Sequence, residues 1–186
     1  MEQRLLSELI LKCKSGDKEA FRPIMQEYAD YLFTLAFRLL RNDEEAKDIV
    51  QETFIKVWQN INSYKKEVKL TTWMYKICIN LCFDKLKSKK RKPLVYEENF
   101  ENIYKSIASE SLIESLDNKQ LAMVIEQLAE GLTPKQQLVF VLKDIQGLES
   151  DEIEEITGLE KGQVKSNLYY ARKEIRNKLI KIGYEV

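Results

Sequence analysis

Apolar and polar residues alternate with the period of an α-helix along most of this chain. Apolar positions three and four residues apart predict helices over residues 2–14, 18–41, 43–60, 71–90 and 116–130, and a further one that starts at Thr133-Pro134. Two more periodic segments follow, over residues 151–157 and from about residue 161 onward. Glycine and proline are scarce, at six and three residues, which disfavours sandwiches and barrels built on tight turns. The pattern predicts an all-α fold.

One stretch interrupts the helical pattern. Residues 93–115 are acidic, contain Ser and Asn, and carry only scattered apolar residues, which is typical of a flexible linker. We therefore expect two small helical domains, over residues 1–92 and 116–186, joined by a linker over residues 93–115. The second domain is predicted to be a four-helix unit.

The end of the second domain has the pattern of a helix-turn-helix. Gly158 is a natural helix stop after an acidic segment, and the next periodic segment begins about three residues later. Two helices that meet at a Gly-containing turn can place the second one in the DNA major groove, although an ordinary helical hairpin has the same pattern. The facing apolar surfaces are predicted to be Ile153, Ile156 and Leu159 on one side and Val164, Leu168, Ala171, Ile175 and Leu179 on the other.

Charge is balanced overall but unevenly distributed. Thirty basic and thirty acidic residues cancel, so the net charge indicates nothing about partners. Residues 65–92 carry ten basic and two acidic side chains, and residues 160–181 carry seven and two. Residues 93–130 instead carry eight acidic and two basic side chains. Two basic regions separated by acidic ones favour two separate nucleic-acid contacts.

The helix over residues 71–90 has a basic and aromatic side opposite its apolar one. Lysines attract phosphates, a ring can stack on a base and an amide can bond a base edge, so this combination suits unstacked single strands. An alternative is that Trp73 is a plain core residue. The apolar side is predicted to contain Tyr75, Cys78, Ile79, Cys82 and Leu86, and the other side Trp73, Lys76, Asn80, Asp84 and Lys87.

The helix over residues 43–60 carries an aliphatic residue on its polar side. Ile55 lies there with Trp58, among acids and amides, and an apolar anchor with a polar rim is typical of a protein interface. The alternative is that another helix of the same domain covers it. The core side is predicted to be Ala46, Ile49, Val50, Thr53, Val57 and Ile61, and the interface side Asp48, Gln51, Glu52, Ile55, Trp58 and Gln59.

Several kinds of chemistry find no support in the sequence. Cys13, Cys78 and Cys82 are better explained as buried small hydrophobes than as ligands, because no His completes a metal site. We expect no cofactor, no metal, no catalytic residue and no enzyme activity. No signal peptide or membrane span is predicted, which favours a cytoplasmic protein.

Four segments in order resemble the bacterial RNA polymerase sigma factors of the extracytoplasmic-function (ECF) group, within the sigma-70 family. They are DEEAKDIVQETFIKVW (43–58), TTWMYKICINLCFDKLKSKKRK (71–92), LTPKQQLVFVL (132–142) and GLESDEIEEITGLEKGQVKSNLYYARKEI (147–175). The resemblance implies a sigma factor that binds core RNA polymerase and starts transcription of a specific regulon from −35 and −10 promoter elements. It also implies an inhibitory anti-sigma factor, membrane-anchored, as a partner.

The resemblance also assigns residues to each contact. The segment over 63–92 would open the −10 element and hold one non-template base outside the stack, while residues 93–115 would thread through polymerase channels. Predicted contacts with the clamp helices of the largest polymerase subunit are Asp48, Gln51, Glu52, Phe54 and Trp58, to which the apolar pattern adds Ile55. Predicted −10 contacts are Trp73, Lys76, Asn80 and Lys87, and predicted −35 contacts are Lys161, Gln163, Lys165, Ser166, Tyr169 and Arg172.

The chain departs from the family pattern at a few positions. Glu149 stands where Ser or Thr usually caps the first helix of the helix-turn-helix, and Ser150 is expected to replace that cap. Lys135 and Gln137 stand where basic residues are frequent, and the loop over residues 65–70 has its own sequence. Other functions to weigh are a stand-alone helix-turn-helix regulator, an adaptor that titrates a sigma inhibitor, and a nucleic-acid enzyme.

Overall fold

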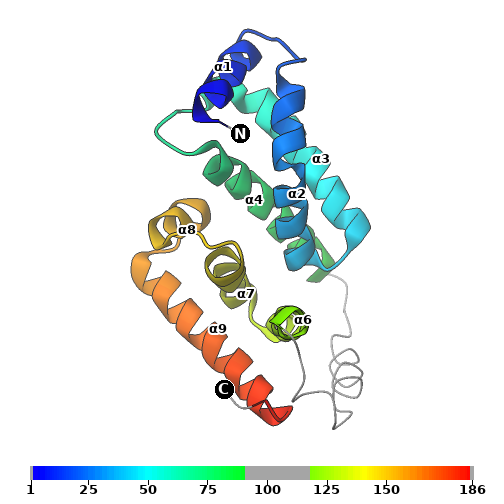
Figure 1. The fold of residues 1–186 in the computed structure, drawn as a ribbon, viewed down its shortest axis with the longest axis vertical. Helices are drawn as coiled ribbons and strands as arrows, with labels where there is room; N and C mark the ends of the chain where they lie inside the picture. Colours follow the sequence, from blue (N-terminus) through cyan, green and yellow to red (C-terminus); the bar gives the residue numbers. More distant parts are fainter. Residues whose placement is uncertain (1, 91–117, 185–186) are drawn as a thin grey trace. The chain divides into compact units, whose positions relative to one another are not determined.

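The computed structural model describes residues 2–90 and 118–184, and every regular element in these ranges is helical (Figure 1). The chain divides into two compact units, Met1–Lys89 and Lys90–Val186. The predicted all-α class is therefore confirmed. The predicted linker over residues 93–115 lies outside the described residues.

The first unit contains four helices and one 3₁₀ turn. They are α1 (Gln3–Lys14), α2 (Phe21–Leu40), α3 (Asp43–Asn60), η1 (Ile61–Ser63) and α4 (Leu70–Lys90). Helices α2 and α3 lie side by side (Figure 1). Leu32 and Leu35 of α2, Val57 of α3 and Met74 of α4 are fully buried, so three helices contribute to one core.

Short polar residues fix where α2 and α3 begin. The Asn42 side chain accepts a hydrogen bond from the Glu45 backbone N–H at 2.9 Å and caps α3. The segment predicted to be helical from residue 18 instead starts with a turn, and α2 begins only at Phe21. The reason is that Asp17 Oδ1 accepts the backbone N–H groups of Glu19 and Ala20, which closes that turn first.

The described part of the second unit contains four helices and two irregular turns. Its elements are α6 (Asn118–Leu128), η3 (Ala129–Gly131), α7 (Pro134–Phe140), the π-helical turn η4 (Val141–Ile145), α8 (Ser150–Thr157) and α9 (Lys161–Lys181). Helix α9 packs against α6, α7 and α8. Buried members of this core are Val124, Leu128, Ala129, Leu132, Phe140, Ala171, Ile175 and Leu179.

The helix-turn-helix is present as predicted. Helix α8 ends at Gly158, whose φ of 71° is the left-handed conformation that glycine adopts most readily. Helix α9 begins three residues later, with the Glu160 N–H donating to Gln163 Oε1 at 3.0 Å. Of its predicted apolar face, Leu168 is half-buried and the other four residues are buried.

Two local predictions differ from the structure. Ser150 is not the cap of α8: Glu149 is the N-cap, and its backbone N–H donates to Glu152 Oε2 at 3.1 Å. The Glu152 carboxylate, at the third helical position, accepts this hydrogen bond, so a Ser at the N-cap is not required. The helix after Pro134 also changes to a π turn, closed by the Gln146 N–H donating to the Val141 carbonyl at 2.9 Å. A π turn contains one residue more than an α-helical turn, and hydrophobic periodicity alone does not reveal this insertion.

Candidate nucleic-acid interface and partner surface

One side of α3 is exposed to solvent over several turns. We call Asp48, Gln51, Glu52 and Ile55 the α3 surface; the first three side chains are exposed, and Ile55 is 55% exposed. No other part of the described first unit covers this isoleucine. The structure therefore brings together the side chains that the sequence pattern places on the interface side of this helix.

Two aromatic residues of α3 lie differently from the α3 surface. Phe54 is only 5% exposed and packs edge-to-face on Phe21, with ring centroids 6.1 Å apart. Trp58 is half-buried, with its ring 5.4 Å from the same Phe21 ring. Phe54 therefore belongs to the core that supports the α3 surface, while Trp58 bridges the core and the surface. Phe54 as a partner contact stays a prediction.

A second surface lies on α4 and consists of Trp73, Lys76, Asn80 and Lys87, here called the α4 surface. Lys76, Asn80 and Lys87 are exposed, and Lys87 lies 3.7 Å from Asp84 in a solvent-exposed ion pair. Trp73 is half-buried because its ring packs against Tyr64, with centroids 5.2 Å apart. Trp73 therefore contacts protein on one side and is partly accessible, and its role as a −10 contact stays a prediction.

Tyr64 is the residue of this region that the sequence analysis misses. Its side chain is buried, at 7% exposure, although it lies in a loop rich in lysine. It packs on Trp73, and its hydroxyl donates to the Val68 carbonyl at 2.7 Å. An isolated aromatic residue in a polar loop is the one sequence signal that could have indicated this position.

The first half of α9 presents the predicted duplex-binding residues on its exposed side. Lys165, Ser166 and Tyr169 are exposed, Tyr169 at 60%. Lys161 and Gln163 are exposed too, but each has a local partner: Lys161 lies 3.6 Å from Asp151, and Gln163 caps the helix. Five of the six predicted residues therefore share one solvent-facing stretch of helix.

An additional tyrosine extends this stretch. Tyr170 is 55% exposed and contacts Tyr169 edge-to-face, with centroids 5.3 Å apart. Two exposed rings in contact form a larger apolar surface than Tyr169 alone, which is the only tyrosine among the predicted −35 contacts. The adjacent Tyr-Tyr pair in the sequence is the signal that could have indicated it.

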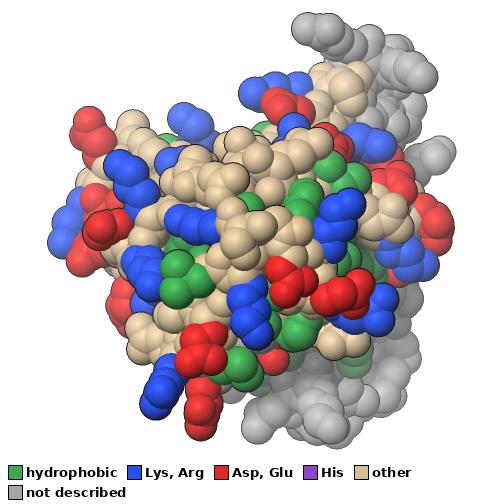
Figure 2. Space-filling view, turned by 90° about the horizontal axis from the view of Figure 1, so that it is seen from above, with side chains coloured by type: hydrophobic (Ala, Val, Ile, Leu, Met, Phe, Trp, Pro, Cys, Tyr) green, Lys and Arg blue, Asp and Glu red, His purple; other side chains and the backbone are tan. Residues whose placement is uncertain are grey.

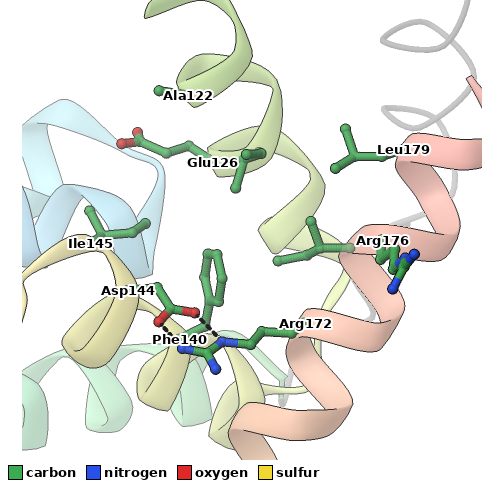
Figure 3. Close-up of a pocket in the computed structure, with 10 residues that line it drawn as sticks. Ala122, Glu126, Phe140, Asp144, Ile145, Arg172, Arg176 and Leu179 are labelled. Atoms are coloured by element: carbon green, nitrogen blue, oxygen red, sulfur yellow. Dashed lines mark hydrogen bonds and ion pairs between the residues drawn. The ribbon is translucent and has the colours of Figure 1, made fainter. Parts of the chain in front are cut away.

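Arg172, the sixth predicted residue, is held within the unit. Its Nε and Nη2 atoms donate to the two carboxylate oxygens of Asp144 at 2.9 and 2.6 Å (Figure 3). These hydrogen bonds raise the pKa of the Arg172 guanidinium, so it stays charged. Asp144 reaches from the π turn and Arg172 from α9, beside a groove of about 590 Å³ that Phe140 and Ile145 help to line. A bidentate pair of this kind fixes both side chains.

Charges of both signs are mixed on the part of the surface shown in Figure 2. Lys and Arg side chains alternate there with Asp and Glu, and hydrophobic side chains are exposed between them. This face lacks a continuous single-sign patch among its described residues. The lysines and arginines predicted to contact nucleic acid lie instead along individual helices, α4 and α9.

The three cysteines contribute to packing. Cys13, Cys78 and Cys82 are free thiols and buried, as predicted, and Cys78 Sγ lies 3.9 Å from the Leu32 carbonyl oxygen. Within the described ranges, no cluster of three or more His, Cys, Asp or Glu side chains is placed to hold a metal ion. None of the helices described there combines the length and the apolar character needed to cross a bilayer.

The described part of the chain thus combines a helix with an exposed apolar residue in a polar rim, a basic and aromatic helix, and a helix-turn-helix, which is an arrangement typical of helical transcription proteins. The family model for Sigma-70 region 2 matches residues 24–92, and the one for Sigma-70 region 4 matches residues 122–175. The chain is 32% identical to the ECF RNA polymerase sigma factor SigW of Bacillus subtilis (strain 168), across 95% of this chain and 98% of the relative. This chain therefore belongs to the ECF RNA polymerase sigma factors.

Further relatives agree with this assignment. The ECF RNA polymerase sigma-E factor of Escherichia coli (strain K12) is 28% identical, over 96% of this chain and 97% of the relative. The fold is similar to CnrH, solved in complex with the cytosolic domain of CnrY, with a TM-score of 0.66 at 18% identity over 93% and 96% of the two chains. It is also similar to RpoE, solved with the anti-sigma factor NepR from Bartonella quintana, with a TM-score of 0.64 at 19% identity over 88% and 98%.

Proposed function

We propose that this sigma factor binds core RNA polymerase through the α3 surface and directs initiation at promoters that carry −35 and −10 elements. The recognition helix α9 contacts the −35 duplex, and the α4 surface receives unstacked bases of the −10 element. Polymerase carries out the chemistry and this chain supplies recognition, in the cytoplasm where the polymerase works. Each DNA contact is weak alone and becomes effective when both are tethered to one polymerase.

The observation that supports this proposal is the presence of all three surfaces on one chain. Ile55 is exposed within a polar rim on α3, as an interface anchor would be. Lys76 and Asn80 are exposed beside a partly accessible Trp73 on α4, and Lys165 is exposed on α9. A regulator that binds only duplex DNA needs the last of these and neither of the others.

We further propose an anti-sigma factor, anchored in the membrane, as the partner that keeps this protein inactive. The sigma factor RpoE, which is similar in fold, was solved in complex with the anti-sigma factor NepR, and this supports the same kind of regulation here. CnrH, also similar in fold, was solved with the cytosolic domain of CnrY. Co-purification of the tagged chain from membranes, followed by identification of the bound protein, tests this partner. Recovery of polymerase alone, from cells where the sigma factor is inactive, would contradict it.

Reconstituted transcription tests the main proposal. Sequencing of transcripts after overexpression locates candidate promoters, and purified chain with core polymerase of its own bacterium should start RNA synthesis at those sites. Core polymerase alone should not. If no promoter found in this way supports initiation, the proposed function is wrong.

Replacement of Ile55 tests the polymerase surface separately. Ile55→Ala is expected to weaken binding to core polymerase by about tenfold, because an exposed apolar anchor with a polar rim carries an interface energy of about 1–2 kcal/mol. Asp48→Ala should weaken it as well. Leu11→Ala, which shortens an aliphatic side chain that is 56% exposed on α1, is the matched control. Equal affinities for the Ile55 and Leu11 variants, with unchanged circular dichroism, would remove Ile55 from the interface.

A further inference from the structure

The loop between η1 and α4, residues 64–69, is held by a lysine from another helix. The Lys14 ammonium on α1 donates a hydrogen bond to the Tyr64 carbonyl oxygen at 2.7 Å, and its nitrogen lies 5.9 Å from the centroid of the Tyr64 ring. The Tyr64 hydroxyl donates to the Val68 carbonyl, and the Tyr64 ring packs on Trp73. We call these four residues the loop clamp. It joins α1, both ends of the loop and the first turn of α4.

The clamp acts on a loop whose side chains are mostly exposed to solvent. Lys65, Lys66, Glu67 and Lys69 are exposed, and Val68 is half-buried. Inside the loop, one backbone hydrogen bond joins the Val68 N–H to the Lys65 carbonyl at 3.3 Å. Because every ordered backbone residue costs conformational entropy, an anchor from another helix helps to keep this exposed loop in one conformation.

Lys14 is suited to that task by its partner atom and its location. An ammonium that donates to a carbonyl at 2.7 Å makes a short, charge-assisted hydrogen bond. The acceptor is a backbone atom, so the contact holds the chain itself, whatever side chains the loop carries. A lysine in the last turn of α1, fifty residues before Tyr64, thereby controls the start of the loop.

An ordered loop lowers the cost of binding an unstacked base. If the loop and Trp73 are already in place, binding does not have to order them, and more of the contact energy appears as affinity. The loop lysines would then face the phosphates of the opened strand from fixed positions. Without the clamp, the same lysines would still attract DNA, but Trp73 would lose the ring that supports it.

We propose that Lys14 is a positioning residue for promoter opening: through Tyr64 it fixes the loop and Trp73 in the arrangement that receives a −10 base. This rests on the function proposed above, in which the α4 surface receives the opened strand. Lys14 itself contacts no DNA in this scheme. Its influence passes through the Tyr64 carbonyl and ring.

The first test uses the free, full-length chain and does not depend on any promoter. In Lys14→Met, which keeps most of the apolar stem and removes the ammonium, amide hydrogen exchange of Tyr64 and Val68 should accelerate by roughly tenfold. Exchange within α2, for example at Leu35, should stay as in wild type. Lys12→Met is the matched control, because Lys12 is an exposed lysine in the same last turn of α1. No change at the loop, or equal acceleration in α2, would overturn the proposal.

The second test measures opening by the reconstituted holoenzyme. With 2-aminopurine in the −10 element, Lys14→Met should reduce the open fraction by roughly tenfold relative to wild type and Lys12→Met. Affinity for core polymerase and for a −35 duplex should not change, and Lys14→Arg, which keeps a cationic donor, should recover part of the loss. Normal opening by Lys14→Met would overturn the proposal. Failure of the wild-type chain to open any promoter would instead count against the proposed function, since the exchange test is independent of it.

Discussion

The α4 surface and the recognition helix α9 carry the same kinds of side chain but support them differently. On α9, Lys165 and Tyr169 extend from a regular helix into solvent, and their positions follow from helical geometry alone. On α4, Trp73 is half-buried against Tyr64, a loop residue that Lys14 holds in turn. The positions of Lys165 and Tyr169 depend on a single helix, whereas that of Trp73 depends on α4, the loop before it and α1.

This difference corresponds to the two forms of DNA that we propose they bind. Duplex DNA is a regular partner whose major groove admits an α-helix, so exposed side chains on a straight helix suffice. An unstacked base has no fixed position until protein groups surround it, and unstacking costs a few kcal/mol. A site for such a base gains from support by several elements, which is what the loop clamp supplies.

The largest effect is expected from replacement of Trp73 on the α4 surface. Trp73→Ala should reduce promoter opening roughly ten- to hundredfold, because one stacked base is worth about 1–3 kcal/mol. It should also lower the thermal stability of the first unit, since the ring covers the buried Tyr64. Tyr169→Ala should leave this stability unchanged and weaken only the −35 contact. 2-Aminopurine fluorescence and thermal unfolding measure the two effects.

Trp73→Phe distinguishes the loss of stacking on a base from a loss of folded protein. A smaller ring in the same position should retain part of the opening and most of the stability. If Trp73→Ala proves stable and opens promoters normally, Trp73 has no part in either function, and the comparison between the two surfaces fails.

A second prediction concerns Tyr75, which packs α4 into the core and is 5% exposed. Burial raises the pKa of Tyr75 from 10.0 to about 12, so the folded state favours the neutral phenol. This contribution to the free energy of unfolding is complete below pH 10 and decreases as the pH rises from about 10 to 12, by about 2–3 kcal/mol in total. Cys82 acts in the same direction, because the hydrogen bond with Cys78 and burial raise the pKa of its thiol.

Urea denaturation at pH 8 and pH 11, followed by tryptophan fluorescence, measures this loss. Both tryptophans lie in the first unit, so the signal reports on that unit. Tyr75→Phe should lose less stability between these pH values than wild type, and Tyr169→Phe, at an exposed tyrosine of the second unit, is the control. Identical pH dependence in wild type and Tyr75→Phe would show that the Tyr75 phenol does not carry the effect.

The smallest effects are expected on α9. They decide whether Arg172 contacts DNA or only holds Asp144 within the unit. Lys165→Ala should reduce the slope of log affinity against log salt for a −35 duplex by about one, as expected for the loss of one phosphate contact. Arg172→Ala should change this slope less, because Asp144 already holds the guanidinium. Fluorescence anisotropy across a salt series, with the reconstituted holoenzyme, compares the two variants.

A double-mutant cycle on Asp144 and Arg172 completes this comparison. The Arg172 side chain is 56% exposed, so the coupling free energy should be modest, at about 0.5–1 kcal/mol. Asp144→Asn should also leave Arg172 freer to reach phosphate. If Arg172→Ala instead reduces the slope of log affinity against log salt by about one, as Lys165→Ala should, Arg172 contacts a phosphate, as its place among the predicted −35 contacts implies.

Much of this molecule was decided by sequence pattern alone. The all-α class and the range of α3 follow from periodicity, and the turn before α9 follows from Gly158. The exposure of Ile55 and the burial of Val164 likewise follow from their places on helical faces. These features depend on residues close together in the chain, where helical geometry leaves few alternatives.

Only the tertiary structure decided the features that join distant residues. No local pattern pairs Lys14 with Tyr64, or Asp144 with Arg172, because each pair lies on separate elements and its distance depends on how those elements pack. The π turn that carries Asp144 adds a residue which periodicity does not register, and Phe54 enters the core because Phe21 of another helix meets it. The sequence by itself therefore determined which helices form and which sides they expose. Packing determined which exposed groups are available to a partner and which are already engaged, because the close contacts that hold a side chain require both elements to be in place.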